Sequence, residues 1–152
     1  FSTFTINRGT DDGIQVDCNV IAGSGLVGIV TDVGSNWATV RSIIDDSSNV
    51  SAMTMSTSDR CIVSGDLRLI NEGKLQFIHL KDDDDRIQEG EKIVTSDVSE
   101  KFLPGILIGY VSEIEEDPNN LTKTGTLTPV VDFEHIREVL VIKELKQQKG
   151  DS

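Results

Sequence analysis

The sequence lacks long hydrophobic runs and is poor in aromatic residues. No stretch of the 152 residues approaches the roughly 18 consecutive apolar residues of a membrane-spanning helix. Phe, Trp and Tyr together make up only 5% of the chain. Apolar residues at helical spacing are almost missing as well. These absences argue against a membrane span within the sequence and against a mainly helical fold.

Positive charge is also scarce, with 14 Lys and Arg against 26 Asp and Glu and a formal net charge of -12. Nucleic acids attract clustered Lys and Arg, so we expect no nucleic-acid partner. The acidic run from Asp82 to Asp85 is interpreted as a solvated surface, because the oxygen-ligand spacing of an EF-hand calcium loop is absent. The sequence assigns no further role to this run.

Cysteine and histidine are limited to two of each. Cys18 and Cys61 exclude a disulfide framework and leave two alternatives, one bridge or two buried free thiols. Without C-x-x-C spacing, and with His79 and His135 far apart, a structural zinc site is not supported. We therefore predict no metal site, no cofactor and no small-molecule substrate.

Short β-branched runs separated by turn residues dominate the chain. Their spacing of roughly eight to twelve residues is typical of a β-barrel or sandwich. Several runs are apolar on both faces, which indicates a second packing surface beyond a single barrel interior. The pattern predicts strands near residues 3–7, 18–22, 26–33, 37–44, 50–56, 60–64, 67–70, 74–80, 91–95, 106–114, 122–131 and 138–143.

A faint internal repeat indicates two lobes of related construction. Asp12-Gly13-Ile14-Gln15 leads to a strand with Gly28 at its middle, and Asp85-Arg86-Ile87-Gln88 leads to a strand with Gly109. A mid-strand glycine lets a barrel bend or admits a neighbouring backbone. We predict an all-β fold with short turns and little helix. Its first lobe spans approximately 1-80 and its second approximately 81-144, with strands that can be exchanged between lobes, followed by a flexible tail at 145-152.

Two motifs resemble those of enzymes. Residues 23–28 match the dinucleotide-binding pattern, but the following residues are β-branched and predict a hairpin turn and a bent strand. Gly150-Asp151-Ser152 resembles the nucleophile tripeptide of chymotrypsin-like proteases, yet it lies in a polar tail without residues for an oxyanion turn. Neither motif is therefore interpreted as a site.

The two histidines are the side chains that a catalytic triad would have to recruit. His79 follows Leu75 and Phe77 at intervals of two residues, so strand alternation places all three on one face. This predicts a core or rim position for His79. His135 lies in a turn and is expected at the surface. We therefore predict no catalytic residues.

Several short motifs also occur in an informative order: Ile6 to Gly9 with Asp12 to Ile14, Gly25 to Val30, Phe102 to Ile106 with Gly109, Pro129 to Phe133, and Glu138 to Val141. In this order the chain, from Ile6 to about Ile142, resembles the extracytoplasmic domain of the rod-shape-determining MreC family. The positions taken as structural motif residues are Gly28, Pro104, Gly105, Gly109, Pro129, Asp132 and Phe133.

The resemblance implies two six-stranded β-barrels at the extracytoplasmic face of the bacterial cell membrane, anchored by an N-terminal transmembrane helix absent from this fragment. It implies a non-catalytic scaffold of the cell-wall elongation complex that maintains rod or elongated cell shape. It also implies a homo-oligomer, either dimer or filament, and binding to a class B penicillin-binding protein and to membrane components of the elongation complex.

Two rival functions and an open question about partner contacts remain. A chymotrypsin-like β-barrel hydrolase would need His79 paired with a carboxylate and a serine. An OB-like nucleic-acid binder would need a basic stripe interleaved with aromatics. The partner-binding residues are not assigned by the sequence. Four side chains either anchor a partner or pack in the core: Trp37, Met53, Met55 and Tyr110.

Overall fold

The computed structural model describes residues 2–82, 86–118 and 121–146 and confirms an all-β fold with little helix. A 3-10 turn (Thr10–Asp12) and one short helix, α1 (Leu67–Ile70), accompany the strands. The strands of the described residues are β1 (Thr3–Ile6), β2 (Asn19–Ala22), β3 (Gly25–Val33), β4 (Ala38–Ser42), β5 (Asn49–Thr54), β6 (Arg60–Ser64), β7 (Leu75–Leu80), β8 (Lys92–Thr95), β9 (Leu107–Asp117), β10 (Thr122–Pro129) and β11 (Leu140–Ile142).

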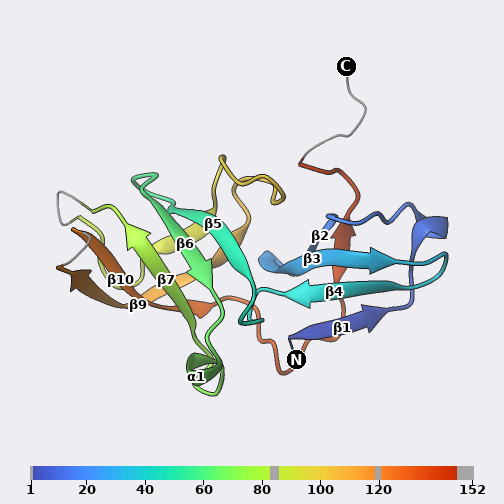
Figure 1. Cartoon of the computed structure of the whole chain (residues 1–152), viewed down its shortest axis with the longest axis horizontal. Helices are drawn as coiled ribbons and strands as arrows, with labels where there is room; N and C mark the ends of the chain where they lie inside the picture. Colours follow the sequence, from blue (N-terminus) through green and yellow to red (C-terminus); the bar gives the residue numbers. More distant parts are fainter. Residues whose placement is uncertain (1, 83–85, 119–120, 147–152) are drawn as a thin grey trace.

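Six consecutive strands, β5 to β10, close into a β-barrel (Figure 1). Going round the barrel, the order is β5-β6-β7-β10-β9-β8, and β8 pairs with β5 to close it. All six pairings are antiparallel. Alternate side chains of these strands fill the interior, among them Leu75, Phe77, Ile93, Ile108 and Leu127.

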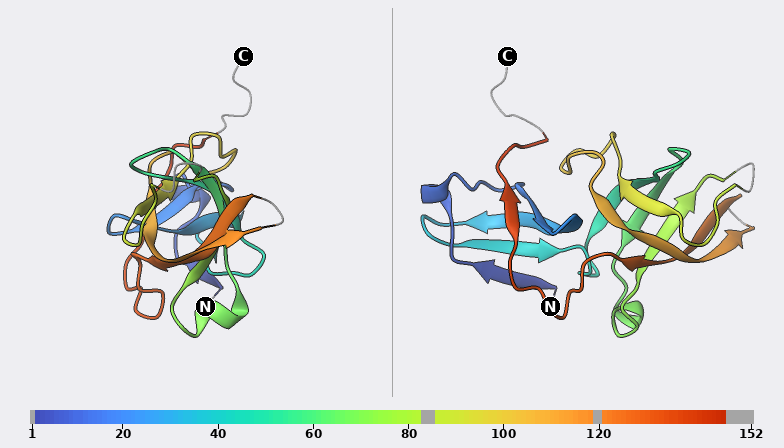
Figure 2. Two further views of the ribbon diagram at one scale, coloured as in Figure 1. Left: turned by 90° about the vertical axis from the view of Figure 1, so that its left-hand side faces the viewer. Right: turned by 180° about the vertical axis from the view of Figure 1, so that it is seen from behind.

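The remaining strands form a second unit, the five-stranded lobe, in the order β1-β4-β3-β2-β11. The chain leaves the barrel after β10 and returns to this lobe, where β11 pairs with β2 (Figure 2). Its core includes Ile14, Cys18, Val20, Val30 and Val40. The described residues thus form one closed six-stranded barrel plus five further strands, with β1 and β11 at the two edges of the second ladder.

Strand β3 joins the two units. It pairs with β9 in parallel at Gly25 and Leu107, and its residues are buried from Gly25 to Val30. Leu26 belongs to the hydrophobic cluster of the barrel and Val27 to that of the five-stranded lobe. A strand with apolar residues on both faces therefore serves two cores, which confirms the prediction of a second packing surface.

The expected division at about residue 80 falls at the end of β7, inside the barrel. β5 to β7 precede this point and β8 to β10 follow it, yet all six strands belong to one closed sheet. Strand pairing therefore groups the six strands β5 to β10 into the barrel. The five-stranded lobe combines the beginning of the chain with its last strand.

The internal repeat corresponds to two similar strand pairs. β2 pairs with β3 and β8 pairs with β9, and each ladder contains a register shift. The predicted turn at Gly23 is also present, since Gly23 has a φ of 60° and β3 begins two residues later. The dinucleotide-like pattern is therefore a hairpin turn followed by a strand.

The prediction of a strand at Leu67–Ile70 is wrong, because these residues form helix α1. Asp66 precedes the helix in an extended conformation, and its carboxylate accepts a hydrogen bond from the Arg68 N–H at 2.9 Å. This is the arrangement of a helix N-cap. The capping aspartate outweighs the strand preference of a four-residue apolar run.

Candidate interaction surfaces

Gly28 and Gly109 occupy equivalent positions where two backbones approach too closely for a side chain. A Cβ on Gly28 would collide with the Arg41 carbonyl oxygen and lie 2.8 Å from Ser42 Cα. A Cβ on Gly109 would collide with the Thr128 carbonyl oxygen and lie 2.8 Å from Pro129 Cα. Both glycines therefore allow close strand packing, one in each unit.

Pro104 and Gly105 form the turn that leads into β9. Gly105 has a φ of 82°, which favours glycine, and its N–H donates to the Thr95 carbonyl oxygen at 3.0 Å. The Thr95 hydroxyl donates to the Leu103 carbonyl oxygen at 2.6 Å and accepts from the Ile106 N–H at 2.8 Å. The turn is thus fixed to the end of β8.

Asn19 connects this turn region to the five-stranded lobe. Its side-chain oxygen accepts a hydrogen bond from the Leu103 N–H at 2.8 Å, and its amide nitrogen donates to the Lys101 carbonyl oxygen at 2.9 Å. Only 1% of Asn19 is exposed. A buried amide that satisfies backbone groups of another segment fixes the position of that segment, so Asn19 holds β2 against residues 101–103.

The return segment, residues 130–141 from the end of β10 into β11, carries Asp132 and Phe133. The Asp132 carboxylate accepts hydrogen bonds from the Glu134 N–H at 3.1 Å and pairs with His135 Nδ1 at 2.9 Å. This hydrogen bond raises the pKa of the exposed His135 imidazole and lowers the pKa of Asp132. Phe133 packs against both hydrophobic clusters. The segment therefore contacts the barrel and the lobe at once.

His79 is exposed, so its predicted place beside Leu75 and Phe77 is wrong. Its φ of 60° turns the side chain outward, and Leu80 is buried in its place. The β7–β10 register shifts at this point, between Gly125 opposite Phe77 and Lys123 opposite Leu80. A β-bulge thus breaks the alternation from which the sequence prediction was made.

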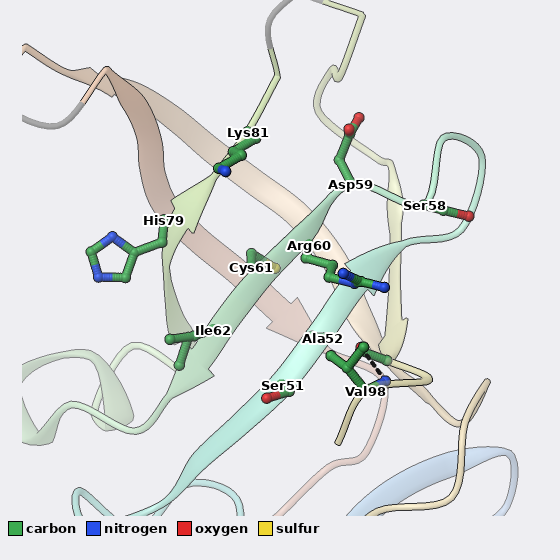
Figure 3. A pocket seen from close by; sticks show the side chains of 11 residues that line it. Ser51, Ala52, Ser58, Asp59, Arg60, Cys61, Ile62, His79, Lys81 and Val98 are labelled. Atoms are coloured by element: carbon green, nitrogen blue, oxygen red, sulfur yellow. Dashed lines mark hydrogen bonds between the residues drawn. The ribbon is translucent and has the colours of Figure 1, made fainter. Parts of the chain in front are cut away.

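A hollow of about 440 Å³ lies beside His79 on the barrel. Arg60, Lys81 and Ser51 also line it, and Figure 3 shows the His79 imidazole pointing away from Arg60. Cys61 lies at this hollow as well, but burial raises the pKa of its thiol to about 12. A thiol that stays protonated is a poor nucleophile, so Cys61 is not an activated nucleophile.

Neither imidazole has a serine hydroxyl as a hydrogen-bond partner among the described residues. Gly150-Asp151-Ser152 lies outside the described residues. Within residues 2–82, 86–118 and 121–146, no group of three metal-ligating side chains occurs. Cys18 and Cys61 are both buried free thiols, so of the two alternatives for these cysteines the disulfide bridge is excluded.

The interpretation of Asp82 as part of a solvated run is wrong. Its side chain is 1% exposed, and its carboxylate lies 2.9 Å from Lys123 Nζ. It also accepts hydrogen bonds from the Arg86 and Ile87 N–H groups at 2.8 and 3.1 Å. Residues 83–85 of the run lie outside the described residues. The ion pair joins Asp82 to Lys123, which lies 41 positions away in the sequence, so no local sequence pattern reveals it.

Three of the four candidate partner anchors lie at the surface. Met55 is 59% exposed, Trp37 39% and Tyr110 36%, whereas Met53 is half-buried. The Trp37 ring packs over Gly34, where a Cβ would collide with the indole. Met55 is therefore the most accessible of these side chains to a partner.

A groove of about 1060 Å³ lies on the five-stranded lobe between β1 and the return segment. β1 contributes Phe4 and Ile6 to its lining, and the return segment contributes Ile136, Val139 and Val141. These five side chains are partly buried against the hydrophobic cluster of the lobe. The groove thus extends the apolar core to the surface, beside an edge strand. No pattern in the sequence marked it, because its two sides are more than 120 residues apart.

Comparison with known proteins decides the family of the chain. Residues 1–143 match the family model described as rod shape-determining protein MreC, barrel core. The chain belongs to the MreC family. It is 32% identical over 144 residues to the cell shape-determining protein MreC of Listeria monocytogenes, which covers 91% of this chain and 47% of that protein. For MreC of Haemophilus influenzae the identity is 28%, over 90% of this chain and 38% of the relative.

Solved MreC structures share the fold. The structure of MreC from Pseudomonas aeruginosa superposes with a TM-score of 0.82 at 26% identity, over 93% of this chain and 88% of that one. MreC of Listeria monocytogenes gives a TM-score of 0.82 at 31% identity, over 92% of this chain and 67% of that one. MreC in a complex with penicillin-binding protein PBP2 from Helicobacter pylori gives 0.71 at 15% identity, over 92% and 85%, and shows the fold alone.

The chain spans less than half the length of the Listeria and Haemophilus relatives. In its described residues, no helix has the length and apolar character needed to cross a membrane. The shared family and fold therefore concern the barrel core of these shape-determining proteins.

Proposed function

We propose that this chain is the extracytoplasmic, non-catalytic scaffold domain of a cell-wall elongation complex, and that it maintains rod or elongated cell shape by binding a class B penicillin-binding protein. The observation that carries the proposal is the match of residues 1–143 to the MreC family, whose member from Helicobacter pylori has been solved in a complex with PBP2. Membership of a family named for shape determination supports the same role.

The chemistry of the described surface supports binding over catalysis. The Cys61 thiol has its pKa raised to about 12, and the His135 imidazole is bonded to Asp132 at the exposed surface. A hydrolase would need a nucleophile hydrogen bonded to an imidazole. By contrast, an unpaired strand edge beside an apolar groove is typical of protein-binding surfaces.

Location and self-association belong to the same proposal. A solved structure described as the major periplasmic domain from the cell shape-determining filament MreC superposes with a TM-score of 0.71. This likeness supports an extracytoplasmic domain that assembles with further copies, as a dimer or a filament. Anchoring by an N-terminal transmembrane helix and contacts with membrane components of the elongation complex complete the proposed role.

A binding titration tests the proposal. The chain, folded as judged by circular dichroism, is titrated with the extracytoplasmic part of a class B penicillin-binding protein from the same organism. We expect saturable binding with a dissociation constant in the micromolar range or tighter, typical of transient to stable assemblies. An unrelated β-barrel of similar acidic charge serves as the control. Absence of saturable binding by the folded chain would contradict the scaffold function.

A further inference from the structure

Among the strands that the structure describes, β1 pairs with β4 alone, so one side of it has no neighbouring strand there. The Ser42 N–H donates to the Ser2 carbonyl oxygen at 2.8 Å, so these two residues face each other at a hydrogen-bonded position. Hydrogen-bonded and non-hydrogen-bonded pairs alternate along an antiparallel ladder. The N–H and C=O groups of Thr3 and Thr5 therefore point away from β4, toward the open side of β1.

The next ladder agrees with this assignment. The Ile43 N–H donates to the Val27 carbonyl oxygen at 2.9 Å across β3 and β4. With the same alternation, the backbone groups of Arg41 point toward β3. They therefore point away from Thr3, the residue opposite Arg41 in the β1–β4 register. Two separate hydrogen bonds thus give the same orientation for the free edge.

The free edge of β1 borders the apolar groove described above. Figure 2 shows β11 running at a steep angle to β1, which explains why β11 does not close the ladder. The groove is also close to neutral in a chain of net charge -12. Three basic and three acidic side chains line it: Arg8, Arg137, Lys143, Asp12, Glu134 and Glu138.

We propose that an extended, mainly apolar segment of the penicillin-binding protein adds to β1 as a further strand, bonded to the backbone of Thr3 and Thr5 with its side chains in the groove. This inference rests on the proposed function and names the surface that performs it. Strand addition at a free edge supplies backbone hydrogen bonds, and the groove supplies selectivity for alternate side chains.

A single extended segment suits the groove better than a second copy of the chain. Residues 133–141 form a wall on the side opposite β1. A strand added to β1 would lie about 4.8 Å from it, on the side where these residues line the groove, so its side chains can contact them. Two copies meeting at β1 would also bring together two chains that each carry a net charge of -12, which repel each other.

The substitution Thr5→Pro tests the inference. Proline removes the outward N–H of residue 5, whereas the β1–β4 hydrogen bonds use other residues, and proline is tolerated on strand edges. The control Thr5→Val keeps the N–H and the branched side chain. We expect Thr5→Pro to weaken binding of the penicillin-binding protein about tenfold, as expected for a lost interfacial hydrogen bond and a blocked edge. Thr5→Val should leave the affinity within about twofold.

Amide hydrogen exchange in the unaltered chain gives a second readout that requires no substitution. The N–H groups of Thr3 and Thr5 should exchange rapidly in the free chain and become protected in the complex. Binding that leaves both amides unprotected, or that Thr5→Pro does not weaken, overturns this inference and leaves the scaffold function standing. Protection that appears at high concentration of the chain alone makes a second copy the occupant and also overturns it. Failure of the unaltered chain to bind overturns both.

Discussion

The Asp82 carboxylate accepts three hydrogen bonds while almost fully buried. Burial alone would raise its pKa, but the hydrogen bonds from Lys123, Arg86 and Ile87 outweigh burial and hold the pKa below its ordinary value. The carboxylate therefore ties the end of β7 to β10 and to the start of the segment that leads into β8. This single side chain stabilises one end of the barrel.

We expect Asp82→Ala to lower the free energy of unfolding by about 3 kcal/mol, because it removes one partner of a buried ion pair and the acceptor of the buried Ile87 N–H. Urea unfolding at neutral pH measures the change. Glu72→Ala, at an exposed loop position, is the matched control and should change stability by less than about 0.5 kcal/mol. An effect of Asp82→Ala as small as that of the control would contradict the structural role.

The ion pair between Asp82 and Lys123 also makes the stability of the fold depend on pH, with a sign that follows from the lowered pKa of Asp82. Because the pKa of Asp82 is lower in the folded than in the unfolded chain, its contribution is present above the unfolded value of about 4. It is lost as pH falls through the folded pKa. The stability difference between the unaltered chain and Asp82→Ala should therefore shrink below about pH 4, whereas a constant difference would exclude this origin.

At the scale of elements, the strands were largely predictable because each depends on local alternation and turn residues. Eleven of the twelve predicted strands correspond to β1 to β11. The exceptions need information that alternation does not contain. The cap of Asp66 converts residues 67–70 to a helix, and the bulge at His79 reverses the side-chain direction.

The sequence predicted that the mid-strand glycines Gly28 and Gly109 allow a bend or a close approach of another backbone, but it did not identify the backbone atoms that approach them. We expect Gly109→Ala to lower the free energy of unfolding by about 2 to 3 kcal/mol, because backbone atoms of Thr128 and Pro129 would have to move. The control Gly105→Ala has open space and suffers only from its positive φ, at about 1 kcal/mol. Urea unfolding of both variants compares them. A smaller effect at Gly109 than at Gly105 would contradict the close strand approach.

At the scale of the whole molecule, the sequence predicted two related units but not which strands each contains. The repeat located β2–β3 and β8–β9 correctly as matching pairs. The pairing of β11 with β2 depends on the path of the return segment, and the groove exists only because of that path. Long-range strand pairing leaves no periodic signal, so the candidate site could not be assigned from residue types.

Asn19 should govern how firmly the two units are held together. We expect Asn19→Ala to lower the free energy of unfolding by about 2 kcal/mol, because the part-buried backbone groups of Lys101 and Leu103 lose their hydrogen bonds to the buried Asn19 amide. We also expect urea unfolding to broaden into two transitions, since the units become less coupled. Asn36→Ala, at an exposed turn, is the control. A single transition with an unchanged midpoint in Asn19→Ala would contradict this coupling.

The return of β11 to β2 also sets an order of assembly. The six strands of the barrel follow one another along the chain, so the barrel can close as soon as β10 has been synthesised. β2 must wait until the last strand emerges, and closing that contact encloses the whole barrel in one loop, with the entropy cost and slow rate of a distant pairing. During this interval the nascent chain carries an open β2 edge, to which a strand of a neighbouring chain could pair.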